Sequence, residues 1–185
     1  MTSKLLYFGP ITLVIEWCGI LLGIHYLASY NTNKAISTVS TAQSPLPLIF
    51  GLTLTTVGIT YFLFGLSLKH ISRRIPYTAF IAGIAFTLTG WIPYTGNGGT
   101  GDLAHNLFNC IAVAGYIAMI WFLREHPLEP ISKASQYFFY MLVVTSFTAL
   151  ISLYILHRFV TYAQLTLLVL IQIWTLVVVW HTKRS

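Results

Sequence analysis

Six long apolar stretches occupy most of this chain and constrain its fold more than any other feature. Each is close to the roughly 20 apolar residues that a helix needs to cross about 30 Å of hydrocarbon. The stretches are Ile11–Ser29, Leu48–Leu68, Tyr77–Tyr94, Asp102–Leu123, Gln136–Leu156 and Tyr162–Trp180. Short connections join them, except for the first external one, and too little chain remains for a separate soluble domain. We therefore predict an all-α integral membrane bundle of six transmembrane helices, in which residues 1–185 form a single domain.

The composition supports lipid as the solvent of this chain. Only 8% of its 185 residues are charged and 56% are hydrophobic, whereas soluble domains carry about 25% charged residues. So few charges cannot cover a water-exposed surface. Cys18 and Cys110 fall inside apolar stretches, and we expect them to be small packing residues rather than a disulfide.

The basic residues predict the orientation of the helices. In the six-span arrangement, eight of the ten lie on one side of the membrane and two on the other. The eight are Lys4, Lys69, Arg73, Arg74, Arg124, Lys133, Lys183 and Arg184, and the two are Lys34 and Arg158. An excess of Lys and Arg marks cytoplasmic loops, so we predict a multi-pass plasma-membrane protein with both termini cytoplasmic. The net charge of +6 then reflects topology and contact with anionic lipids, and we expect no nucleic-acid partner.

A stripe of polar residues opens the fourth apolar stretch. Asp102, His105, Asn106 and Asn109 are spaced at i, i+3, i+4 and i+7, which places them on one helical face. Such a face has to meet other helices or water, because ionisable groups in the bilayer are costly. One interpretation makes the stripe the wall of a site, with Asp102 accepting the ring N–H of His105. The other makes Asp102 a helix cap and the amides interhelical contacts.

The long connection Tyr30–Pro47 is rich in hydroxyl and amide side chains and carries two prolines. It is too polar to span a membrane. We expect it to fold as a partly ordered cap over the outer end of the fourth helix, with Ser37 or Ser40 contacting the polar stripe.

Histidines at one level of the bundle suggest a metal site as an alternative. The topology places His25, His157, Asp102 and His105 near the outer ends of their helices. Three nitrogens and a carboxylate could hold zinc with an open position for water. The spacing matches no metal motif, and shared depth alone is weak support, so we expect no cofactor.

Glu16 is the acid that lies deepest in an apolar stretch. We expect it to be protonated, or paired with a threonine or with Gln172 across the bundle. A proton relay would need more polar groups than this pair supplies.

Several short segments resemble a family of small bacterial and archaeal six-span proteins, the domain of unknown function 998. The matching segments are Ser29-Tyr30-Asn31, Ile36-Ser37-Thr38-Val39-Ser40, Ser44-Pro45 leading into Phe50-Gly51, and His105-Asn106. The resemblance implies the same six-helix topology and no established reaction. It also implies a distant similarity to DRAM and Sfk-type membrane proteins, which are connected with lipid organisation or remodelling. No catalytic residue can be transferred from the family.

Together these patterns favour a membrane protein with an outward-facing polar pocket that binds a lipid headgroup or small polar ligand without catalysis. Its walls would be Ser37, Ser40, Asp102, His105, Asn106 and Asn109. A metal-dependent lipid hydrolase and a structural or assembly subunit of a membrane complex are the alternatives. The expected partners are membrane lipids, and a homo-oligomer or a membrane-complex partner stays open.

Overall fold

The computed structural model describes residues 3–26, 46–95, 98–156 and 160–184, and the regular structure within these ranges is helical. A short helix α1 (Ser3–Leu6) precedes six long helices. These are α2 (Phe8–Tyr26), α3 (Leu46–Ser67), α4 (Arg74–Trp91), α5 (Thr100–Leu123), α6 (Glu129–Ile151) and α7 (Val160–Arg184). A π-helical turn, Ser152–Leu156, continues α6. The prediction of an all-α chain with six long helices is confirmed.

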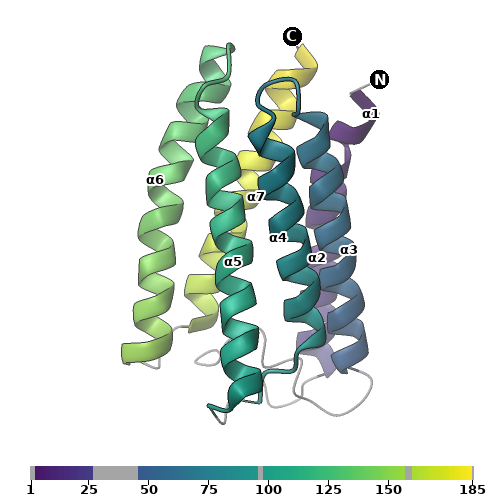
Figure 1. The fold of residues 1–185 in the computed structure, drawn as a ribbon, viewed down its shortest axis with the longest axis vertical. Helices are drawn as coiled ribbons and strands as arrows, with labels where there is room; N and C mark the ends of the chain where they lie inside the picture. Colours follow the sequence, from purple (N-terminus) through teal and green to yellow (C-terminus); the bar gives the residue numbers. More distant parts are fainter. Residues whose placement is uncertain (1–2, 27–45, 96–97, 157–159, 185) are drawn as a thin grey trace.

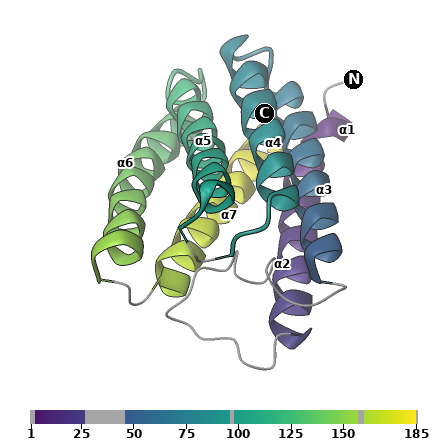
Figure 2. The same cartoon turned by 60° about the horizontal axis from the view of Figure 1, so that its bottom comes forward.

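The six long helices run up and down, and both ends of the chain lie at the same end of the bundle (Figure 1). Helices that follow one another in the chain pack against one another, and α7 also contacts α2. The helices therefore form a ring in chain order that α7 closes. When the end away from the termini is turned toward the viewer, α7 is seen between α5 and α6 on one side and α2, α3 and α4 on the other (Figure 2). We call the end that carries the termini the terminal end, and the other the distal end.

Five of the helices in the described ranges, α2, α3, α5, α6 and α7, are long and apolar enough to cross a membrane. By helix length and hydropathy, the chain is a multi-pass membrane protein. Helix α4 is not among the five: it has only 18 residues, and Arg74, Pro76 and Tyr77 make its first turn polar. It nonetheless runs alongside α3 and α5 (Figure 1).

The helix bounds differ most from the prediction at α6. This helix begins at Glu129, seven residues before the predicted Gln136, with Pro130 in its first turn. Pro130 is tolerated there, because the first helical positions have no intrahelical N–H bond for proline to remove. The other five long helices begin within three residues of the predicted starts.

Close packing of α3 against α4 depends on facing glycines. A Cβ atom placed on Gly58 would lie 2.4 Å from the carbonyl oxygen of Gly83, and one placed on Gly83 would lie 2.6 Å from that of Gly58. The two backbones therefore touch directly. Small residues at helix interfaces are the usual means of close association in lipid.

The exposed surface of the bundle is apolar along its length. Val14, Phe80, Val144 and Ile173 are among many large hydrophobic side chains that face outward. A soluble monomer rarely exposes so much contiguous apolar surface, so lipid is the natural solvent here. Cys18 and Cys110 are free, as expected, and both are exposed on this surface rather than buried between helices.

Candidate functional site

A cavity of about 150 Å³ lies inside the ring, in its distal half. Five helices, α2, α3, α4, α5 and α7, contribute to its wall. The lining is mostly apolar, with seven polar side chains: Glu16, Thr53, Thr89, His105, Asn109, Tyr116 and Gln164. A mostly apolar cavity with a few convergent polar groups is typical of a binding site for a small molecule. We call this space the central cavity.

A second cavity of about 200 Å³ lies between α5, α6 and α7, and we call it the lateral cavity. Its polar lining comes from Asn106, Asn109, Ser146, Tyr154 and Gln164. Asn109, Val113, Gln164 and Leu167 line both cavities. The two spaces therefore adjoin one another across the place where α5 faces α7.

The bundle is hollow at one end because its well-packed core lies at the other. Fully buried residues such as Phe64, Ile75, Met119, Ile131 and Trp174 belong to the terminal halves of α3, α4, α5, α6 and α7. Helix α7 packs mainly on α6 and touches α2, with little contact to α5. The distal halves of α5 and α7 therefore leave the space that the cavities occupy.

His105 is the polar side chain of the central cavity with the clearest unmet hydrogen bond. The residue is fully buried, at 0% exposure. Its Nδ1 lies 2.6 Å from the carbonyl oxygen of Ile92, which can only accept, so Nδ1 carries the proton. Nε2 is then left as an acceptor, and it has no hydrogen-bond partner among the described residues. Buried polar atoms without partners are rare. This nitrogen lone pair, in the wall of a cavity, is therefore available to accept a hydrogen bond from a molecule inside it.

Asp102, one turn before His105, organises the connection between α4 and α5. Its Oδ1 accepts hydrogen bonds from the backbone N–H of Thr95 at 2.5 Å and from Thr95 Oγ1 at 3.0 Å. Its Oδ2 accepts from the N–H of Gly98 at 2.9 Å. The predicted hydrogen bond between Asp102 and the ring of His105 was wrong, because the carboxylate faces this connection and the ring donates to Ile92.

Tyr94 lies in the same connection and packs near His105. The ring centroids of the two residues are 5.5 Å apart. Burial, followed by the negative charge of Asp102, raises the pKa of the Tyr94 hydroxyl above its usual value of 10.0. Tyr94 is therefore a neutral hydrogen-bonding group beside the site at physiological pH.

The other predicted site residues fall in three places. Asn109 lines both cavities, and Asn106 lines the lateral cavity. The polar stripe thus contributes His105, Asn106 and Asn109 to cavity walls. Ser37 and Ser40, with their predicted contacts to the stripe, lie outside the described residues.

Glu16 also lines the central cavity, from α2. The amide Nε2 of Gln172 donates a hydrogen bond of 3.3 Å to its carboxyl group. The amide oxygen of Gln172 in turn accepts from Trp17 Nε1 at 2.7 Å. The predicted pairing of Glu16 with Gln172 is confirmed, and it links α2 to α7 at the cavity wall.

Reasoning from the sequence missed the contribution of Gln164, Tyr116, Thr53 and Thr89 to the central cavity. Gln164 had a detectable signal, since it is an amide within the apolar stretch Tyr162–Trp180, where polar groups need partners. The threonines had none, because threonine commonly bonds its own helix, as Thr89 Oγ1 does to Ala85.

The structure does not support the alternative of a metal site. Among the described residues, no group of three or more His, Cys, Asp or Glu side chains could hold a metal ion. His157 lies outside the described residues. The Asp102 oxygens and the Nδ1 atom of His105 are already engaged by backbone and threonine partners.

Comparison with known proteins adds no relative: no family model, no curated protein and no solved structure matches this chain.

Proposed function

We propose that this chain is a six-span plasma-membrane protein, with both termini cytoplasmic, that binds a lipid headgroup or a small polar ligand in the central cavity without catalysis. The observation that carries the proposal is the buried Nε2 atom of His105, which lines the cavity and lacks a partner among the described residues. A ligand that donates a hydrogen bond satisfies it. The family resemblance noted from the sequence points to lipid as well.

The membrane topology rests on helix packing and on charge. Helix α4 joins α3 and α5 in the ring, so it crosses the membrane with them despite its polar first turn. Three of the basic residues at the terminal end, Arg74, Arg124 and Lys183, also contact aromatic rings there. Lys183 Nζ lies 3.8 Å from the centroid of Tyr7, and the guanidinium carbon of Arg124 lies 3.2 Å from that of Trp121. Such pairs suit a membrane–water interface, and the excess of Lys and Arg at this end favours the cytoplasmic one.

Cysteine labelling tests this orientation. In a Cys18→Ser, Cys110→Ser background, Gly99→Cys places a thiol in the distal connection between α4 and α5. A membrane-impermeant maleimide should label it in intact cells. The matched control, Glu125→Cys in the terminal connection between α5 and α6, should be labelled only after lysis. The reverse pattern would invert the topology.

Two substitutions of His105 separate binding from packing. The amide nitrogen of asparagine can replace Nδ1 as the donor to Ile92, but His105→Asn removes the Nε2 acceptor. The amide oxygen of glutamine reaches the Nε2 position, so His105→Gln keeps an acceptor in the cavity and loses the bond to Ile92. We expect His105→Asn to lose the molecule that co-purifies with the wild type. We expect His105→Gln to keep it and to be less stable by about 1 kcal/mol, the scale of one hydrogen bond.

Mass spectrometry of bound molecules and thermal melting provide the two measurements. If both variants retain the co-purified molecule at the wild-type level, His105 has only a packing role and the proposed site is wrong. A wild-type protein that carries no molecule when it is purified from membranes in mild detergent would favour the assembly-subunit alternative.

A further inference from the structure

We infer that the ligand is a single-chain amphiphile of the acylglycerol type, which enters from the bilayer between α5 and α6. An uncharged, hydrogen-bond-donating head occupies the central cavity, and its hydrocarbon chain lies in the lateral cavity. This inference rests on the proposed function and adds the class of ligand and its route.

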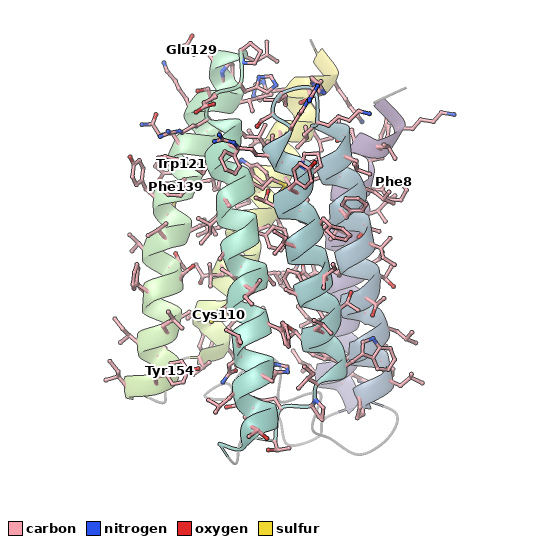
Figure 3. All side chains as sticks on the ribbon, viewed as in Figure 1. Phe8, Cys110, Trp121, Glu129, Phe139 and Tyr154 are labelled. Carbon is pink, nitrogen blue, oxygen red and sulfur yellow. The ribbon has the colours of Figure 1, made fainter. Side chains whose placement is uncertain are left out.

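The mouth of the lateral cavity lies on the membrane-facing surface. Three of its lining residues, Cys110 on α5, Leu150 on α6 and Tyr154 in the turn after α6, are exposed. Figure 3 labels Cys110 on the distal half of α5 and Tyr154 at the distal end of α6. At the terminal end the same two helices are held together by Trp121 and Phe139, whose ring centroids are 4.6 Å apart. The helices separate toward the distal end (Figure 1), so the opening lies where a lipid chain can enter sideways.

The interior of the route offers polar contacts in the order that such a ligand needs. Ser146 lines the lateral cavity, and its Oγ atom is buried with no hydrogen-bond partner among the described residues. A hydroxyl there can donate to an ester carbonyl at the start of an acyl chain. Farther inside, Asn109 and Gln164 line both cavities, and the His105 Nε2 acceptor lines the central one. An ester between a hydroxyl-bearing head and a chain meets these groups in sequence.

The charge of the central cavity argues against a phosphate head. Its described lining contains the carboxyl group of Glu16 and contains no lysine or arginine. A buried anion without a basic partner is strongly disfavoured, whereas a neutral polyol can donate to His105 and to Glu16. The volume of about 150 Å³ is like that of an engineered cavity that admits benzene, so it suits a head of glycerol size.

The two native cysteines supply a test within one molecule. Both are exposed, but only Cys110 borders the lateral cavity, while Cys18 lies on α2. Wild-type protein in nanodiscs is treated with the membrane-permeant reagent N-ethylmaleimide, and modification of each cysteine is followed by peptide mass spectrometry. Saturating monooleoylglycerol should slow the reaction of Cys110 by about tenfold or more, on the scale of a well-occupied site, and leave Cys18 within about twofold. Oleoyl lysophosphatidate, which has the same chain and a phosphate head, should protect neither cysteine.

A cavity-filling variant checks the route independently of Cys110. Ala149→Trp places an indole in the lateral cavity, and native mass spectrometry compares the retention of monooleoylglycerol and of short-chain monobutyrylglycerol. We expect the variant to lose the long-chain ligand by about tenfold, which is about 1.4 kcal/mol, and to keep the short one. Leu103→Trp, on the exposed face of α5 away from both cavities, should retain both and controls for folding.

The outcomes separate this inference from the proposed function. One outcome rejects only the lateral route: His105→Asn abolishes the binding of monobutyrylglycerol, Ala149→Trp still retains monooleoylglycerol, and monooleoylglycerol does not protect Cys110. The central site would then stand. Equal protection by lysophosphatidate overturns the choice of an uncharged head. If neither acylglycerol binds while the co-purified molecule still depends on His105, the acylglycerol class is wrong. If His105→Asn also leaves the co-purified molecule in place, both proposals fail.

Discussion

Replacement of Gly58 by valine tests whether the direct backbone contact between α3 and α4 holds the bundle together. A Cβ atom at this position would lie 2.4 Å from the carbonyl oxygen of Gly83, whereas ordinary contact begins at 3.4 Å. The two helices therefore have to separate by about 1 Å before the two further methyl groups of valine are placed. The obstacle is backbone, so no side-chain rotation can relieve the clash.

The expected loss of stability follows from this geometry. Overpacking of a well-packed interface costs about 1–3 kcal/mol. The better helix propensity of valine over glycine offsets only about 0.3 kcal/mol. We therefore expect Gly58→Val to lower the free energy of unfolding by about 2 kcal/mol, and Gly58→Ala to lower it by less.

Unfolding of the purified protein in mixed micelles, followed by circular dichroism, measures this change. Gly99→Val is the matched control, because a Cβ atom there meets nothing within 4 Å and the extended backbone of Gly99 suits valine. Its stability should change by no more than about 0.5 kcal/mol. If Gly58→Val melts with the wild type, the close approach of α3 and α4 is not part of the stable fold.

Two further predictions concern His126 and Asp102, which lie near the two ends of α5. His126 Nδ1 accepts the N–H of Leu128 at 2.9 Å, and burial lowers the pKa of His126 below its usual 6.5. As the pH falls, the unfolded chain therefore binds a proton at this histidine before the folded chain does. The stabilising contribution should be fully present above about pH 6.5 and should be lost as the pH drops below it. Thermal melting between pH 8 and pH 5 measures this, and a melting temperature that does not change with pH would contradict the prediction. Asp102→Asn replaces a charged acceptor of backbone N–H groups at the α5 N-terminus. We therefore expect the free energy of unfolding to fall by about 1–2 kcal/mol. A variant as stable as the wild type would show that Asp102 does not anchor the connection before α5.

The helices could be predicted from the sequence because hydropathy is a local property. The length of each helix follows from its own apolar stretch, so five of the six predicted helix starts lie within three residues of the starts in the structure. The start of α6 was missed because Pro130 has two meanings. Proline interrupts a helix interior but is tolerated in the first turn, and only the path of the preceding connection decides between them.

The site was predictable only in part. Periodicity correctly placed Asp102, His105 and Asn109 on one face of α5, and this face looks into the bundle. The partner of His105 was not predictable, because Ile92 reaches it through the connection before α5. The cavities were not predictable either. They depend on how far α7 stands from α5, and no local sequence pattern encodes a distance between helices so far apart in the chain.

A structure of the wild-type protein in lipid nanodiscs would test the central claim most directly. We expect density for a non-protein molecule in the central cavity, with an oxygen or nitrogen atom about 2.7–3.2 Å from His105 Nε2. We also expect the distal halves of α5 and α7 to stay apart around this molecule. A bundle in which α7 closes against α5, the cavity is gone and His105 Nε2 bonds to protein would show that this chain has no central binding site.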